Sequence, residues 1–183
     1  MLFEIEVVVI WLALAITGMK MRATTLPNFA SFLTHWVWLL TIFYFVGDIA
    51  LRHNPKWSKW FHTLFLIPTL SLSWSVFFGV MAVLYLNPGL ITSHEFTGLA
   101  LLVDRVFHIL PTLWMTIFIA ARRRIEKKRW SFVLTLIVPS IYFILYPHPS
   151  LIYGTPGAFD VWGVAAFLSM SILIGVFITQ KIY

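Results

Sequence analysis

The residues with the clearest chemical potential lie in one apolar stretch, LLVDRVFHILPTLWMTIFIA. Asp104 and His108 are four residues apart, so a helix would place them on the same face. Arg105 directly follows Asp104. Because charged groups are unfavourable against lipid, we expect this face to point into a bundle of helices. The structural alternative is an Asp104–Arg105 pair near the outer headgroups, with His108 as a packing residue.

A second polar stripe lies in the stretch ASFLTHWVWLLTIFYFVGDIAL. Spacing by seven residues would place Thr34, Thr41 and Asp48 on one face of a helix. Threonines in helices commonly donate a hydrogen bond to the carbonyl four residues earlier, and this structural role is the simplest interpretation of Thr34 taken alone.

Together these residues have the composition of a nucleophilic site. A threonine hydroxyl is a poor nucleophile until a base takes its proton, and a neutral histidine can be that base. Asp104 could hold the imidazole of His108 in the required tautomer, as the carboxylate does in hydrolase triads. Arg105 could attract a carboxylate of the substrate. We therefore predict Thr34, His108 and Asp104 as catalytic residues and Arg105 as a substrate-binding residue.

The elements that would position these residues are membrane-spanning helices. The chain has 183 residues, of which 60% are hydrophobic and 11% charged, against about one-quarter charged in soluble domains. We predict an all-α polytopic membrane protein, a single transmembrane helical bundle over 1–183. Its six helices are expected at Leu2–Met19, Ala30–Leu51, Phe61–Leu86, Phe96–Ala121, Trp130–Tyr146 and Val161–Thr179. The first stretch is expected to remain in the protein, because the acidic start MLFEIE does not resemble a signal peptide.

The basic residues divide unequally between the two sides of this bundle. The side that receives both termini and the RRRIEKKR segment carries Arg52, Lys56, Lys59, Arg122, Arg123, Arg124, Lys127, Lys128, Arg129 and Lys181. The other side carries only Lys20 and Arg22. The positive-inside rule therefore predicts cytoplasmic N- and C-termini and gives no reason to invoke nucleic acid. Trp57, Trp60 and Trp130 lie beside the basic loops, as interfacial anchors do.

Span counting places Thr34 and His108 at similar depths. If each helix ends at its basic loop and spans ~20 residues, His108 lies ~9 Å below the outer boundary and Thr34 ~5 Å below it. Side chains lean toward the N-terminus of their helix, and histidine is the longer of the two, so contact is feasible if the two faces meet. Ser171 and Gly175 form a small-xxx-small pair that favours close helix packing.

Three stretches carry a resemblance to a known family: FLTHWVWLLTIFYFVGDI, WFHTLFLIPTLSLSWSVFFGVMAVLYLNPGLI and LLVDRVFHILPTLWMTIFI. In order, spacing and topology, residues from about Ser31 to Arg122 resemble the androgen-induced / androgen-dependent TFPI-regulating family of six-helix intramembrane threonine hydrolases. The family's catalytic threonine and histidine fall by position on Thr34 and His108. The resemblance implies hydrolysis of fatty acid esters of hydroxy fatty acids, or related acyl esters, within the membrane.

Other functions stay open at this point. The chain has no cysteine, so disulfides, zinc–thiolate sites, iron–sulfur clusters and cysteine nucleophiles are excluded. A transporter or channel would explain intramembrane Asp, Arg and His, although the sequence shows no inverted repeat. A haem-binding electron carrier would need facing histidines, and only His35 and His108 lie near a common depth. We expect no cofactor, no metal and no nucleic acid, and the expected partner is a lipid substrate in the bilayer.

Overall fold

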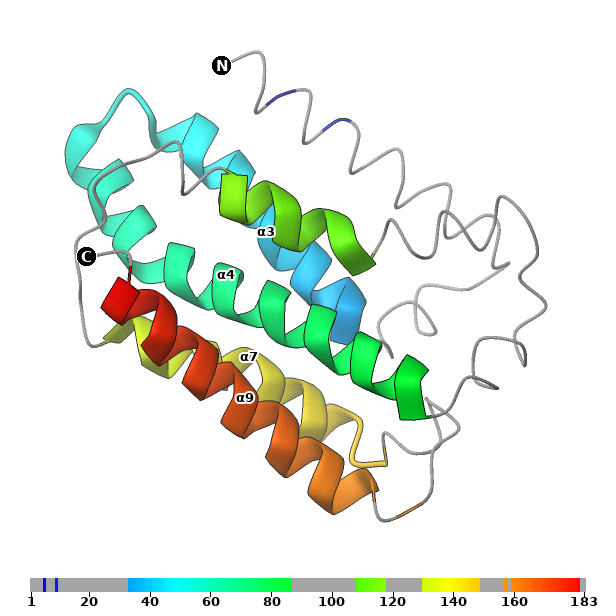
Figure 1. The fold of residues 1–183 in the computed structure, drawn as a ribbon. Coiled ribbons are helices and arrows are strands. Elements are labelled where there is room, and N and C mark those ends of the chain that lie inside the picture. The colour runs from blue at the N-terminus through cyan, green and yellow to red at the C-terminus, as the bar shows by residue number, and fades with distance from the viewer. Residues whose placement is uncertain are drawn as a thin grey trace.

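The computed structural model of the chain describes residues 33–86, 108–117, 130–148 and 159–181, together with Ile5, Val9 and Gly157. The regular structure in these residues is entirely helical, as predicted. The helices are α3 (Leu33–Leu51), α4 (Pro55–Leu86), α7 (Trp130–Leu145) and α9 (Phe159–Lys181), with a further helical segment at 108–117, drawn in green (Figure 1).

Three of these helices are long and apolar enough to cross a membrane, over Leu33–Leu51, Pro55–Ala82 and Asp160–Phe177. Val133–Leu145 in α7 is apolar but shorter. Apart from Ile5 and Val9, the stretch predicted as the first span lies outside the described residues, as does most of Phe96–Ala121. The helices therefore suit a membrane protein, and the number of spans and the side of the termini remain predictions.

The helix α4 begins earlier than the hydropathy pattern indicates, at Pro55 rather than Phe61. Asn54 precedes it, and its Oδ1 accepts a hydrogen bond from the backbone N–H of Trp57 at 3.3 Å. Asparagine is a favoured N-cap, and proline at the first helical position has no N–H to leave unsatisfied. The Asn-Pro pair thus starts α4 within the basic segment. The run of apolar residues, from which the helix was predicted, begins only later.

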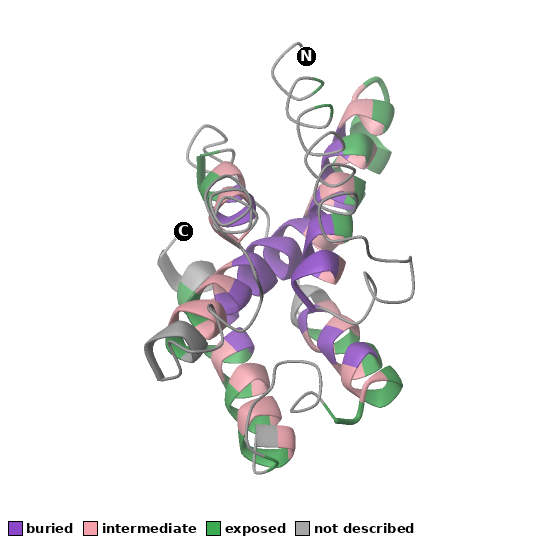
Figure 2. Cartoon of the chain, turned by 90° about the vertical axis from the view of Figure 1, so that its right-hand side faces the viewer, coloured by how far each residue is buried: buried purple, intermediate pink, exposed green. Residues whose placement is uncertain are grey.

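The central element of the bundle is α4, which packs against α3, α7 and α9, while α7 and α9 also pack against each other (Figure 1). Buried residues concentrate along α4 and on the sides of the other helices that face it (Figure 2). The outward sides of α9 and α7 carry exposed large apolar side chains, including Trp162, Leu173 and Ile144. Such a surface is expected where lipid, rather than water, is the neighbour.

Small residues allow α9 to pack closely against the central helix, α4. Ser171 and Gly175 are buried, and they follow Phe167 by one and two turns on the same face of α9. The ring of Phe167 lies 3.7 Å from the position that a Cβ on Gly79 of α4 would occupy. Burial of Ser171 and Gly175 agrees with the close packing expected from their spacing.

Candidate functional site

Thr34 lies in the first turn of α3 and is only 6% exposed. It shares a helix face with Trp38 and Phe45, which follow it by four and eleven residues and are each 1% exposed. Trp38 and Phe45 belong to a buried cluster that includes Met115 of the segment 108–117. The face of α3 that carries Thr34 is therefore the face that packs toward this segment.

The register between α3 and α4 fixes the depth of Thr34. The two helices form an antiparallel hairpin (Figure 1) whose closed end is marked by contacts of His62 with residues of α3. Toward the open end, Leu33 and Val37 belong to one buried cluster with Leu72 and Val76. Thr34 therefore lies near the level of residues 72–76 of α4.

The same level of α4 holds the segment 108–117. The hydroxyl of Thr112 donates a hydrogen bond to the carbonyl oxygen of Ser73 at 2.9 Å. Met115, three residues later, is fully buried in the cluster with Trp38 and Phe45, nearer the closed end of the hairpin. The segment thus runs in the same direction as α3, and both begin at the same end of the bundle (Figure 1).

His108 precedes Thr112 by four residues, so it lies on the same face about 6 Å nearer the open end. That end is where α3 begins with Leu33 and Thr34. His108 is half-buried. The described helices therefore bring Thr34 and His108 to a similar depth, and the faces that carry them contribute Trp38, Phe45 and Met115 to one buried cluster. Asp104 and Arg105 lie outside the described residues.

Seven Ser and Thr hydroxyls in the described helices have the structural role considered for Thr34. Each donates to the carbonyl four residues earlier, at 2.7–2.9 Å, in Thr41, Thr63, Thr69, Ser73, Ser75, Thr116 and Ser171. Such bonds satisfy the hydroxyl within its own helix. The corresponding acceptor for Thr34 would be the carbonyl of Ala30, which lies outside the described residues. Thr41, on the same face as Thr34, is the natural reference for a purely structural threonine.

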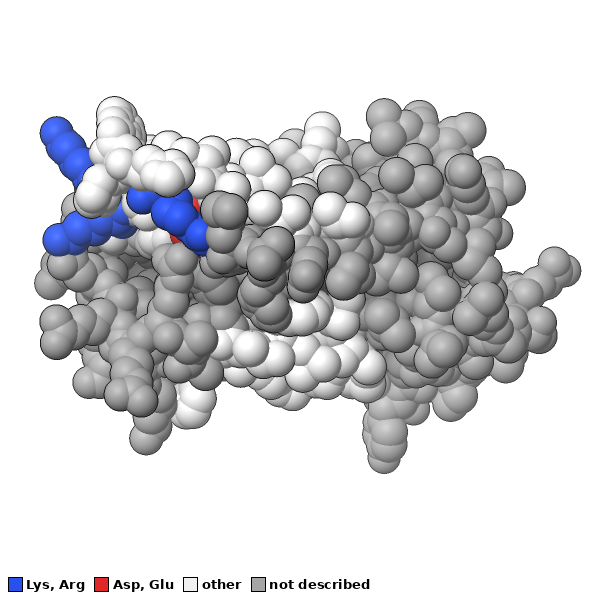
Figure 3. Space-filling model, turned by 90° about the horizontal axis from the view of Figure 1, so that it is seen from above, with Lys and Arg blue, Asp and Glu red and all other residues white. Residues whose placement is uncertain are grey.

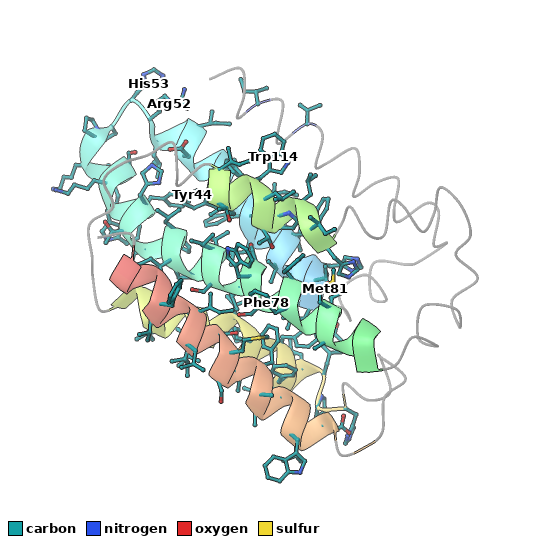
Figure 4. All side chains as sticks on the ribbon, in the orientation of Figure 1. Tyr44, Arg52, His53, Phe78, Met81 and Trp114 are labelled. Atoms are coloured by element: carbon teal, nitrogen blue, oxygen red, sulfur yellow. The ribbon has the colours of Figure 1, made fainter. Side chains whose placement is uncertain are left out.

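A second group of polar side chains lies near the closed end of the hairpin, and it was not predicted from the sequence. Asp48 is 1% exposed, and its Oδ1 lies 2.8 Å from Nε2 of His62. The other ring nitrogen of His62, Nδ1, lies 2.7 Å from the hydroxyl of Tyr44. Arg52 approaches Oδ2 of Asp48 at 3.8 Å. We call Tyr44, Asp48, Arg52 and His62 the hairpin cluster; Figure 4 labels Tyr44 and Arg52.

In the hairpin cluster, both ring nitrogens of His62 have a partner, Tyr44 at Nδ1 and Asp48 at Nε2. When Tyr44 donates to Nδ1, the proton of the neutral ring resides on Nε2 and is donated to Asp48. The carboxylate is then paired on both oxygens, by His62 and Arg52. Tyr44 is fully buried, stacked on Phe61 with ring centroids 5.8 Å apart. Burial of the phenol favours a role in holding α3 to α4 rather than in attacking a substrate.

One sequence signal could have identified this cluster. Asp48 lies four residues before the short turn at residues 52–54 and His62 eight residues after it, one on each arm of the antiparallel hairpin. Two ionisable residues in apolar helices, one on each arm, are candidates for pairing because an isolated charge there is costly.

The described residues hold no group of three or more His, Cys, Asp or Glu side chains that could bind a metal ion. Among the residues that the structure describes, the open end carries Thr34, His35 and His108, and the closed end carries the hairpin cluster. Comparison of the chain with protein-family models, with curated proteins and with solved structures gives no match.

Proposed function

We propose that the protein is an intramembrane lipid ester hydrolase in which Thr34 is the nucleophile and His108 the general base. The observation that carries the proposal is the common depth of these residues, which follows from the Thr112–Ser73 hydrogen bond and from the shared packing of Met115 and Trp38. The family resemblance of the sequence, which names the same two residues, is an independent argument for the pair.

The reaction would proceed in two steps. His108 takes the proton of the Thr34 hydroxyl as its oxygen attacks the ester carbonyl, and then gives that proton to the leaving alcohol. The resulting acyl-threonine is hydrolysed by a water molecule that His108 activates in turn, which releases a fatty acid and restores the hydroxyl. Asp104 would orient the imidazole, and Arg105 would attract a free carboxylate on the substrate.

The substrate class follows from where the site would lie. A site below the headgroups receives esters whose acyl chains partition into the bilayer, and fatty acid esters of hydroxy fatty acids meet this condition. The proposal includes the full six-span bundle with cytoplasmic termini, which places Thr34 and His108 in the outer half of the membrane. Its support is the charge asymmetry of the loops and the three helices long enough to span.

The decisive experiment is labelling of the purified protein with a lipid-like fluorophosphonate, followed by mapping of the modified residue and assays of ester hydrolysis in liposomes. Thr34→Ala and His108→Ala should each lower turnover by at least about 10²-fold, and the double variant should lose little more, because the residues act as one unit. Thr34→Ser keeps the hydroxyl and should retain activity, and Asp104→Asn should cost less than loss of the base.

The matched control is Thr41→Ala, which removes a buried threonine from the same face of α3 whose hydroxyl bonds to the carbonyl of Val37 at 2.8 Å. This variant should hydrolyse the ester at the wild-type rate. Full activity of a folded Thr34→Ala protein, or labelling at another residue, would place the nucleophile elsewhere.

A non-enzymatic transporter is the second candidate, and the buried hairpin cluster is the observation that favours it. An intramembrane carboxylate linked to a histidine and a tyrosine is a typical component of proton pathways. Proton flux into liposomes that depends on Asp48, together with the absence of ester hydrolysis, would select this function over the hydrolase.

A further inference from the structure

The outer surface of the turn between α3 and α4 combines two features that no function above uses. Trp57 and Trp60 are 53% and 48% exposed, although large aromatic side chains normally bury most of their area. Their rings meet edge to face, with centroids 5.9 Å apart. Lys56 and Lys59 are exposed beside them. We call these four residues the turn surface.

On the side of these helical turns that faces the bundle, side chains of α4 pack against α3. Phe61 is 4% exposed and lies against Gly47 of α3, where it stacks on Tyr44. The turn surface therefore projects from α4 on the side away from the bundle. A tryptophan pair exposed at the end of an apolar helix suits the boundary between hydrocarbon and headgroups, where an aromatic body meets a polar layer.

Lys56 and Lys59 give the turn surface two positive charges, whereas the acid of the adjoining turn of α3 is buried. Asp48 is 1% exposed and faces His62 and Arg52. Among the described residues, the visible lysine and arginine side chains lie at one end of the molecule, with a small acidic area beside them (Figure 3). The complementary ligand is an anion at the level of the tryptophan rings, which is the position of a phospholipid headgroup.

We propose that the turn surface binds the headgroups of anionic phospholipids in preference to zwitterionic ones. Lys56 and Lys59 attract the negative headgroup, and Trp57 and Trp60 lie against the upper part of the acyl chains. This surface is separate from Thr34 and His108, at the opposite end of α3, so the proposal does not depend on the hydrolase function.

The test measures lipid binding to the purified full chain in detergent by native mass spectrometry, with phosphatidylglycerol and phosphatidylcholine as probes. The wild-type protein should bind phosphatidylglycerol more tightly. Loss of one lysine near an anionic headgroup weakens binding about five-fold, so Lys56→Gln combined with Lys59→Gln should weaken it by roughly 25-fold. Lys56→Arg with Lys59→Arg should restore binding, because both charges are kept.

Three controls make the outcome decisive. Lys20→Gln with Arg22→Gln removes the same charge from another loop and should leave phosphatidylglycerol binding unchanged. Trp57→Ala with Trp60→Ala should weaken binding of both lipids, since it removes apolar contact without changing charge. Inorganic phosphate should compete poorly, because it has no acyl chain. Equal binding of the two lipids, equal losses in both charge-removal variants, or full displacement by phosphate would overturn the proposal.

Discussion

At the scale of single residues, Thr34 and Thr41 have the same side chain but different expected roles, the first catalytic and the second structural. Both are buried on one face of α3, and Thr41 donates to the carbonyl of its own helix. What distinguishes Thr34 is its level in the bundle, which it shares with a histidine of another helix. Depth can be counted from sequence, because helical rise is constant. The rotation of two helix faces toward each other is a tertiary property, and only the structure shows that Met115 and Trp38 belong to one buried cluster.

The hairpin cluster provides a prediction at the same scale. Asp48→Asn should lower the free energy of unfolding by about 2 kcal/mol, because a hydrogen bond to a charged group is lost inside the bundle. Tyr44→Phe should cost about 1 kcal/mol, since one neutral hydrogen bond to His62 is removed. The measurement is denaturant unfolding of the purified protein in detergent, followed by helical circular dichroism.

A double-mutant cycle separates the pair from its surroundings. Asp48→Asn and His62→Gln should show a coupling free energy of about 1–2 kcal/mol, as residues joined by a hydrogen bond do. The matched control uses His53, an exposed histidine of the same turn, labelled in Figure 4. Asp48→Asn and His53→Gln should be additive. Additivity in both cycles would show that the 2.8 Å contact does not stabilise the hairpin.

At the scale of helices, the packing of α3 against α4 depends on a glycine. A Cβ on Gly47 would overlap the ring of Phe61. That ring cannot easily move aside, because it is 4% exposed and packs against Tyr44 and Phe65, the latter with ring centroids 4.9 Å apart. The sequence did not indicate this requirement, since a glycine in an apolar helix looks the same whether its neighbour is a ring or open space.

Gly47→Ala should therefore destabilise the protein by about 1–3 kcal/mol through overpacking, although alanine is the better helix former. Gly79→Ala is the matched control within α4. Its Cβ would meet the ring of Phe167 at 3.7 Å, an ordinary contact, so this variant should be neutral or stabilised by up to about 1 kcal/mol. Thermal unfolding of both variants in one detergent measures the difference, and equal midpoints would contradict the packing of Phe61 on Gly47.

At the scale of the whole molecule, hydropathy alone predicted the helical class and the ends of several helices. The bounds of α7 and α9 agree with the expected Trp130–Tyr146 and Val161–Thr179 within about two residues, because long apolar runs have no competing structure. The predicted start of α4 was wrong by six residues, since its first turn carries Lys56, Ser58 and Lys59 and breaks the apolar run. The hairpin cluster was missed because pairing of Asp48 with His62 requires knowing which faces of α3 and α4 meet.

The orientation of the bundle is the last prediction, and the absence of cysteine makes it directly measurable. In the predicted six-span topology, ten Lys and Arg residues lie on the side of the termini and two on the other, so the basic loops should stay in the cytoplasm. A single cysteine at Ser58 or Glu126 should react with a membrane-impermeant maleimide only after the cells are opened. A cysteine at Thr25, between the first two predicted spans, should react in intact cells. Labelling of Ser58→Cys from outside would invert the bundle and move Thr34 and His108 to the cytoplasmic half of the membrane, where a hydrolase would draw on a different pool of lipid esters.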